Sequence, residues 1–393
     1  MQEHESLYQG REQSLVKHLI LQRYLERFSH IIGQHWQSIT YVDCFSGPWQ
    51  TKSDSFADSS FGIAIQELRK ARDTVQRQFG KTVRLRCFFL EKNAAAYVRL
   101  ASVPSQYPDI EIHTRNGTLE DSVCEIIQFV KNDNRTFPFI LIDPTGWTGF
   151  ALDVIRPLLR LDPGEVLMNF MIEFIRRFWN APDESTRQPF VRLFGSERFR
   201  EDLIQLPPEE RDDAAAFEYL KTVQREGNFP HASLAVVLHP AIDRRFFYLP
   251  YLTRHPKGIE VFKDAEKRSM QDMERLRAEA MQRKRTRKRG PELFGSEEVH
   301  DPRYFDGLRD RYLSGAKSTV QELLAAQQDV AYDEIWKKAL VWPMVWESDV
   351  KEWIADWLSE GLLLRIEGMG PRQRVPQRGL SNVLVWKSTR PKP

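Results

Sequence analysis

Short apolar segments alternate with helical segments along the first two thirds of the chain, and this alternation is the feature that most constrains the fold. β-Branched and aromatic residues fill these segments, which are SITYVD (38–43), VRLRCFFLE (83–91), DIEIHT (109–114), FPFILIDP (137–144) and EVLMNF (165–170). The segments between them have helical spacing, such as the apolar positions of residues 14–32. Continuous apolar strands separated by helices are typical of a parallel sheet that helices cover on both faces.

Two further apolar segments, ASLAVVLH (232–239) and RRFFYLPYLT (244–253), lie close together in the sequence. Seven strands whose last two are adjacent suit the class I methyltransferase sheet, in which a terminal hairpin inserts one antiparallel strand. We therefore predict an α/β fold with a Rossmann-like class I methyltransferase sheet of seven, mostly parallel strands. We assign this domain to residues 1–262.

Charge is concentrated after this domain. Residues 263–290 contain eleven Lys or Arg against five Asp or Glu, a local charge of +6, whereas the whole chain carries +2. The rest of the chain therefore carries −4, which indicates one polyanion-facing element on a mildly acidic body. We predict a basic helical arm and linker over residues 263–312.

The C-terminal residues 313–393 form a third predicted domain. Helical segments run from Thr319, Tyr332 and Ser348, and two short strands, LLLRIEG and NVLVWK, follow them. Three helices followed by two strands is the order of a winged-helix domain, a variant of the helix-turn-helix.

The cysteine and hydropathy patterns indicate the cellular compartment of the protein. Cys44, Cys87 and Cys124 form no CxxC pair, which argues against a zinc site or a disulfide framework and favours reduced thiols in the cytoplasm. The N-terminal MQEHESLYQG is polar, without the apolar core of a signal peptide. No apolar run approaches the roughly 18 residues that a membrane helix needs, so we expect no membrane contact.

The turn after the first strand reads Asp43-Cys44-Phe45-Ser46-Gly47. Nucleotide-like ligands of open α/β sheets bind beyond the carboxyl ends of the strands, and glycine lets the backbone approach them closely. We name Asp43, Phe45 and Gly47 as candidate cofactor residues. An ordinary strand-to-helix turn with an acidic helix cap is the alternative.

Two polar residues follow the next strands. Glu91 ends the second strand, where a carboxylate often accepts both hydroxyls of a ribose because its two oxygens match a diol. Asn116 follows the third strand, where an adenine would lie. A position beside a helix cap is the alternative for Glu91, and a plain turn is the alternative for Asn116.

The candidate catalytic residues are Asp143 and Pro144, after the fourth strand. In amino-methylating enzymes an acid or amide before proline accepts a hydrogen bond from the target amine and keeps its lone pair aimed at the methyl group. Proline stiffens the turn and exposes the following carbonyl. A simple strand-to-turn dipeptide is the alternative interpretation.

The basic run at 283–289 is a candidate nucleic-acid contact, because basic side chains laid along phosphates release counterions. A solvated charge run is the alternative. The six candidate residues are Arg283, Lys284, Arg285, Arg287, Lys288 and Arg289.

Taken together, these motifs resemble the three-Cys-motif partner proteins (TcmP), a bacterial family regarded as methyltransferase-like. The resemblance runs through KHLILQRYL, YVDCFSGP, FFLE, FILIDPTG, EVLMNF, YLTRHPKGIEVFKD and the tryptophan-rich tail. It implies S-adenosyl-L-methionine (SAM) as cofactor, with Asp43, Phe45 and Gly47 at its turn, Glu91 at the ribose and Asp143 at the reacting centre. It also implies a partner protein with a three-cysteine, radical-SAM-like motif.

Two positions depart from that family. Trp49 stands where the family's DxFAGxG turn has its last glycine, and the segment at 59–62 reads SSFG instead of a GSP-type sequence. Both lie in the cofactor-binding stretch, and an indole beside the methionine moiety would narrow the pocket.

Three functions are compatible with these residues. The first is a SAM-dependent methyltransferase that acts on an amino group of a nucleic acid or nucleotide. The second is a catalytically degenerate protein that binds DNA, RNA or a partner through the basic arm and the winged helix. The third is a hydrolase with Mg²⁺ held by Asp43 and Asp143, although no further acidic or histidine cluster supports such a metal site.

Overall fold

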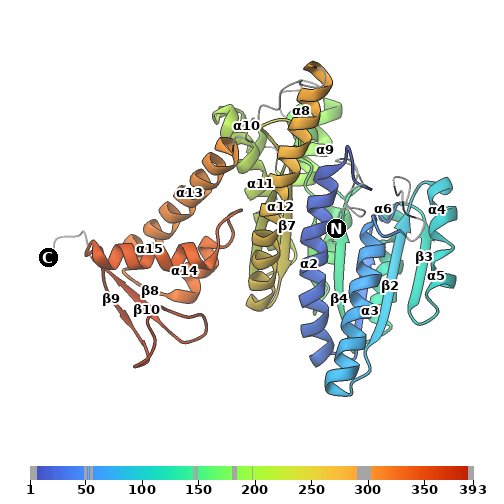
Figure 1. Ribbon diagram of the computed structural model, residues 1–393, viewed down its shortest axis with the longest axis horizontal. Helices are drawn as coiled ribbons and strands as arrows, with labels where there is room; N and C mark the ends of the chain where they lie inside the picture. Colours follow the sequence, from blue (N-terminus) through green and yellow to red (C-terminus); the bar gives the residue numbers. More distant parts are fainter. Residues whose placement is uncertain are drawn as a thin grey trace. The chain divides into compact units, whose positions relative to one another are not determined.

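The computed structural model describes residues 7–47, 51, 53, 56–144, 146, 149–178, 184–196, 198–289 and 302–387. The chain divides into two compact units, Met1–Glu297 and Glu298–Pro393. Figure 1 colours them from the blue N-terminus to the red C-terminus. None of the helices within these residues is long and apolar enough to cross a membrane.

The first unit contains a seven-stranded sheet in the order β3-β2-β1-β4-β5-β7-β6. β7 is antiparallel to both of its neighbours, and the other described pairs are parallel. The predicted seven-stranded, mostly parallel sheet with an inserted antiparallel strand is therefore confirmed. The strands are β1 (Ser38–Asp43), β2 (Arg84–Glu91), β3 (Glu111–Asn116), β4 (Thr136–Ile142), β5 (Glu165–Met168), β6 (His231–Leu238) and β7 (Arg245–Thr253).

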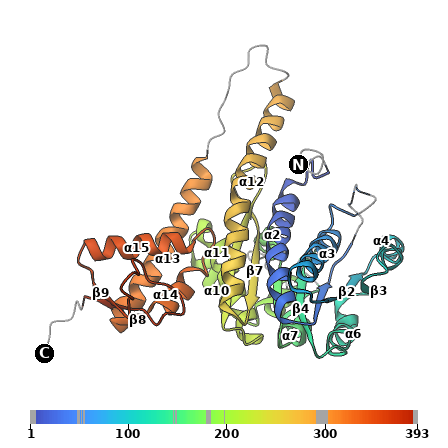
Figure 2. The ribbon, with the colours of Figure 1, turned by 60° about the horizontal axis from the view of Figure 1, so that its bottom comes forward.

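Helices cover both faces of this sheet. One face carries α12, α2 and α3, which lie side by side in Figure 2, and α6, α7 and α11 form the second layer. The continuous burial of β1 and β5, and of β4 apart from the half-buried Phe137, follows from this double cover. The helices of the unit are α2 (Glu12–His35), α3 (Ser60–Phe79), α4 (Ala94–Leu100), α5 (Val103–Gln106), α6 (Leu119–Lys131), α7 (Leu152–Leu159), α8 (Ile172–Phe178), α9 (Glu184–Phe194), α10 (Arg198–Gln205), α11 (Pro208–Glu226) and α12 (Pro256–Arg289).

The predicted basic arm is the continuation of α12, which starts before residue 263. Met273, Leu276 and Ala280 are buried, and α12 contacts α2, β6 and β7. This apolar stripe joins most of the helix to the first unit, so the division into compact units differs from the predicted boundary at residue 262.

The second unit has its own core, in which Trp336 and Trp357 are fully buried. The predicted helices and two strands are present, and an additional strand of three residues, β8, pairs with β10 in the order β8-β10-β9. Its first helix begins at Arg303, ahead of the predicted boundary at 312. The elements are α13 (Arg303–Gln327), β8 (Asp329–Ala331), α14 (Tyr332–Ala339), α15 (Glu347–Ser359), β9 (Leu363–Glu367) and β10 (Val383–Trp386).

Candidate functional site

The three acidic residues singled out in the sequence lie at one edge of the sheet. β1 lies between β2 and β4, and Asp43 is level with Phe89 and Leu141. Glu91 and Asp143 each follow two residues later on their own strands. Because parallel strands end at the same edge, three neighbouring carboxyl ends deliver these side chains to one region.

Asp43 builds the turn after β1. Its side chain is 0% exposed. Its Oδ1 accepts a hydrogen bond from the Phe45 amide at 3.1 Å, and its Oδ2 accepts one from Ser60 Oγ at 2.5 Å. Burial raises the pKa of Asp43 from 3.8 to about 6, although these hydrogen bonds oppose the shift. Asp43 therefore positions the loop and the start of α3, and its carboxylate does not face solvent.

The loop that follows crosses toward β2. The Ser46 amide donates to Leu90 O at 2.8 Å, and the Gly47 amide donates to Phe45 O at 2.9 Å. Phe45 and Gly47 are half-buried. This path places the predicted cofactor turn over the end of β2. Trp49, the residue expected to narrow the pocket, lies outside the described residues.

Glu91 and Asn116 are neighbours at the ends of β2 and β3. Glu91 is 7% exposed, and its Oε1 accepts a hydrogen bond from the Asn93 amide at 2.5 Å. The described residues provide no hydrogen-bond partner for its Oε2. The Asn116 amide nitrogen donates to the Glu91 carbonyl at 2.8 Å. One carboxylate oxygen of Glu91 is therefore available to a ligand, while Asn116 holds the two strand ends together.

Asp143 is held by two residues that the sequence analysis did not select. Lys17 of α2 forms an ion pair with its Oδ2, and Asn169, which follows β5, donates to its Oδ1 at 2.8 Å. The side chains of Lys17 and Asp143 are 15% and 13% exposed, so solvent reaches this cluster. Pro144, the next residue in the chain, is buried. We call Lys17, Asp143 and Asn169 the β4 cluster.

The β4 cluster contains a buried hydrogen-bond acceptor without a donor. Asn169 is 4% exposed, and its Oδ1 has no hydrogen-bond partner within the described part of the chain. The orientation of this amide is fixed, because its nitrogen must face the Asp143 carboxylate, which only accepts. Leaving such an oxygen unpaired costs about 1–3 kcal/mol. The site therefore lacks one donor.

Residues of this cluster line a small cavity. Lys17, His18, Ser60, Asp143 and Asn169 are among its lining residues, the surface that opens onto it is apolar, and its volume of about 10 Å³ is room for a single water molecule. An amino group has nearly the same size as water. The cavity thus has the dimensions of one amino group or one water, while the acceptor oxygens of Asp143 and Asn169 belong to its lining residues without opening onto it.

The N-terminal segment packs beside this cavity. The hydroxyl of Tyr8 is 2.7 Å from Nδ1 of His18, and burial raises the pKa of Tyr8 well above its usual value. Arg11 pairs with Asp58 at 3.0 Å, which ties the segment to the residues before α3. His18 is therefore buried in a structural contact next to the β4 cluster.

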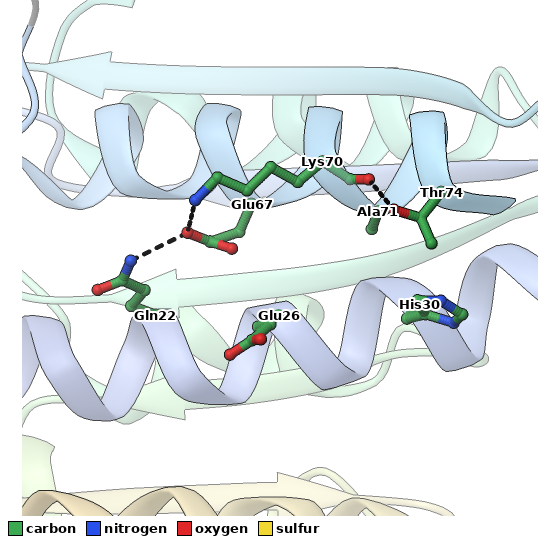
Figure 3. Close-up of a pocket in the computed structure, with 7 residues that line it drawn as sticks. All are labelled: Gln22, Glu26, His30, Glu67, Lys70, Ala71 and Thr74. Carbon is green, nitrogen blue, oxygen red and sulfur yellow. Dashed lines mark hydrogen bonds and ion pairs between the residues drawn. The ribbon is translucent and has the colours of Figure 1, made fainter. Parts of the chain in front are cut away.

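A larger groove lies elsewhere, between α2 and α3 (Figure 3). Its volume is about 300 Å³. Glu67 points into it, with one oxygen accepting hydrogen bonds from Gln22 and Lys70, while Glu26 and His30 line the α2 side. None of the candidate residues lines this groove. Although it is larger than the cavity at the β4 cluster, it is separate from the site at the strand ends.

Two of the basic-arm residues contact other parts of the first unit directly. Arg283 pairs with Glu12 at the start of α2, and Lys284 donates to the carbonyl of Ala241 at 3.1 Å. Arg285 belongs to the same helix. The side chains of the other candidates, Arg287, Lys288 and Arg289, lie outside the described residues.

The Mg²⁺ interpretation conflicts with the contacts that Asp43 and Asp143 make. One oxygen of Asp43 accepts a hydrogen bond within the turn, the other accepts one from Ser60 at the start of α3, and the Lys17 ammonium pairs with Asp143. A cation between the two carboxylates would have to displace these groups. Among the described residues, no group of three or more His, Cys, Asp or Glu residues could hold a metal ion.

No protein-family model and no curated protein sequence matches the chain. Solved structures with similarity include cofactor-bound Rv0187 from MTB (11% identity, 60% of this chain and 79% of that chain, TM-score 0.29). The O-methyltransferase TomG from Streptomyces achromogenes in complex with SAM has 12% sequence identity and a TM-score of 0.29. The match covers 60% of this chain and 79% of that chain. Loganic acid methyltransferase with SAH has 10% sequence identity and a TM-score of 0.30. The match covers 70% of this chain and 87% of that chain.

Similarity at this level carries no conclusion about the site. The strand order and the antiparallel β7 are consistent with a Rossmann-like methyltransferase fold for the first unit. Membership in the three-Cys-motif partner family stays a prediction.

Proposed function

We propose that the chain is a SAM-dependent methyltransferase that methylates an amino group of a nucleic acid or nucleotide. The observation that carries this proposal is the unpaired, buried Oδ1 of Asn169 beside Asp143, two residues that are among those lining a cavity of the size of an amino group. An amino group offers two N–H donors, and these two residues offer acceptors at the carboxyl ends of neighbouring strands.

The residues at the ends of β1 and β2 fit an adenosyl cofactor. Glu91 has one oxygen available for a ribose hydroxyl, and the loop through Phe45 and Gly47 passes over the end of the same strand. Asp43 would act through this loop, because its own carboxylate is enclosed. SAM supplies a methyl group that its sulfonium already activates, so the protein needs chiefly to bind and align.

Asp143 and Asn169 would orient the acceptor. A carboxylate has about four lone-pair positions, and Lys17 and Asn169 use two of those on Asp143. Asp143 can therefore still accept one N–H, while Asn169 Oδ1 accepts the other. Both N–H bonds then point into the cluster and the lone pair of the nitrogen is directed away from it. Pro144 keeps this turn rigid.

Isotopic methyl transfer tests the proposal. The protein is incubated with trideuteromethyl SAM and mixed-sequence DNA or RNA, and the digested nucleosides are analysed by mass spectrometry. We expect label on an exocyclic amine with the unaltered protein and with the control Glu125→Gln, which changes a half-exposed carboxylate that pairs with His113. We expect a loss of about 100-fold or more with Asp143→Ala. An unchanged rate in Asp143→Ala would refute the assignment.

A second candidate function is a binding protein without catalysis. It is favoured by the occupation of both Asp143 oxygens by groups of the chain itself and by a cavity that holds only one water. In this case the basic run of α12 and the second unit, with its predicted winged-helix order, would bind DNA, RNA or a partner protein. Nucleic-acid affinity that falls steeply with salt, without any SAM binding, would support this candidate.

A further inference from the structure

Lys17 has hydrogen-bonding capacity that its ion pair does not use. An ammonium group has three N–H donors, and Asp143 is the one hydrogen-bond acceptor for Lys17 within the described ranges. Its nitrogen also lies 5.8 Å from the ring centre of Phe247. Because the side chain is still 15% exposed, an unused donor of Lys17 can reach a ligand that approaches from solvent.

Donor and acceptor positions follow a fixed order across the β4 cluster. Asn169 and Lys17 hold the two oxygens of the same carboxylate, so they flank Asp143. The unpaired Asn169 oxygen lies on one side as an acceptor, and the Lys17 ammonium lies on the other side as a donor. A ligand that matches both must carry N–H donors next to an acceptor.

An amidine edge has this pattern. In such an edge an amino group is bonded to a carbon whose neighbouring ring nitrogen carries a lone pair, as in adenine and cytosine. The two nitrogens of an amidine are about as far apart as the two oxygens of a carboxylate, which is why such forks pair well.

Other amino acceptors fit less well. Of the two ring nitrogens beside the amino group of guanine, N1 carries a hydrogen and would present a donor to a donor, and N3, which has a lone pair, lies on the side of the base that carries the sugar. An alkylammonium would place a second cation beside Lys17 and would give it no acceptor.

The geometry points to Lys17 as the specificity-determining residue of this site, which donates a hydrogen bond to the ring nitrogen next to the acceptor amine of an adenine- or cytosine-type base. This inference rests on the proposed methyltransferase function and names its substrate class. This role also explains why an ammonium group lies at a site for an amine, because the ammonium donates a hydrogen bond to the neighbouring ring nitrogen.

Two isomeric probes test the inference without any turnover. 4-Aminopyrimidine has the amidine edge, whereas 5-aminopyrimidine has the same atoms with the amino group away from the ring nitrogens. Their dissociation constants are measured by ligand-detected NMR on the full chain with S-adenosylhomocysteine present. We expect 4-aminopyrimidine to bind about tenfold more tightly, which corresponds to one hydrogen bond from a charged donor.

Variants at Lys17 test whether this residue causes the preference for 4-aminopyrimidine. Lys17→Met removes the donor, so both isomers should bind equally, whereas Lys17→Gln keeps an N–H donor and should retain part of the preference. Lys70→Met, at an exposed lysine of α3, is the matched control and should leave the preference unchanged. If Lys17→Met does not fold, the unaltered protein and Lys17→Gln decide the question.

The outcomes separate the inference from the proposed function. Equal affinity for the two isomers in the unaltered protein, or a full preference in Lys17→Met, overturns the role of Lys17 alone, provided that SAM binds. Absence of SAM binding in a parallel calorimetric titration overturns the proposed function and this inference with it.

Discussion

The ammonium group of Lys17 pairs with the carboxylate of Asp143, 126 residues away in the sequence. This contact joins α2 to the end of β4, and Asn169 completes the cluster from the end of β5. Both partners of the ion pair are largely buried, so each depends on the other for compensation of its charge.

Asp143→Ala should therefore lower the free energy of unfolding by about 2–4 kcal/mol, because the Lys17 ammonium loses its partner. Urea denaturation measures this change. The double variant Lys17→Met/Asp143→Ala should recover part of the loss, since no unpaired charge remains. Strictly additive effects of the two substitutions would show that the ion pair has no energetic role.

Asn169→Leu should separate function from stability. The substitution removes a hydrogen bond to a charged group, worth about 1.5–3 kcal/mol, and also an unpaired buried oxygen that costs about 1–3 kcal/mol. These contributions nearly cancel, so the melting temperature should change little while methyl transfer falls by about 100-fold. A variant with the unaltered transfer rate would exclude Asn169 from the acceptor site.

The raised pKa of Asp43 should make the stability of the folded protein depend on pH. Its pKa is raised from 3.8 to about 6 by burial, so the folded state binds the proton more tightly than the unfolded state. The contribution of this residue to stability is therefore greatest below about pH 4 and is lost as the pH rises through about 6, by about 3 kcal/mol in total. Asp43→Asn cannot ionise, so its stability relative to the unaltered protein should improve between pH 4 and pH 7. Urea titrations at both pH values measure this difference, and a constant difference would contradict the shift.

The basic run of α12 should contribute to nucleic-acid binding in a salt-dependent way. Replacement of Arg283, Lys284, Arg285, Arg287, Lys288 and Arg289 by Gln should weaken binding and flatten the slope of log affinity against log salt. Fluorescence anisotropy with a labelled oligonucleotide measures both quantities. Glu12→Gln is an informative comparison, because it removes one of the two carboxylates that pair with Arg283 and should slightly strengthen binding. Unchanged affinity of the sixfold variant at low salt would reject this role.

Gly258 should be intolerant of a side chain. A Cβ there would collide with Tyr251 Oη and would lie 2.7 Å from Thr253 Oγ1 and 2.9 Å from Glu165 Oε1, all within a buried network at the start of α12. Gly258→Ala should cost about 1–3 kcal/mol through overpacking. Gly307→Ala is the matched control, because no atom lies within 4 Å of its Cβ and alanine favours the helix by about 0.5–1 kcal/mol. Thermal denaturation compares the two, and equal melting temperatures would contradict the packing.

The sheet and its acidic edge could be predicted from the sequence because each depends on local information. The strands are continuous apolar segments, and Asp43, Glu91 and Asp143 follow them directly. Parallel pairing then brings strand ends together without any knowledge of side-chain contacts. The three-residue β8 was not predicted, because a strand of that length depends on pairing with β10.

The contacts within the site could not be predicted in the same way. Lys17 is one of several charged residues on an amphipathic helix, and its contact with Asp143 depends on how α2 packs on the sheet. Asn169 directly follows β5, just as Asp143 directly follows β4, so its place at the same edge of the sheet could be predicted. Its hydrogen bond to Asp143 could not. The enclosure of Asp43 depends on Ser60, whose hydroxyl reaches it from α3.

A calorimetric titration with SAM is the decisive measurement, because the proposed methyl transfer requires an adenosyl group at the ends of β1 and β2. The unaltered protein should bind SAM with a dissociation constant on the order of micromolar, and Glu91→Ala should weaken binding about tenfold by removing the oxygen available to the ribose. The Glu125→Gln control should bind like the unaltered protein. Absence of binding by the unaltered protein, or equal affinity of Glu91→Ala, would contradict the account.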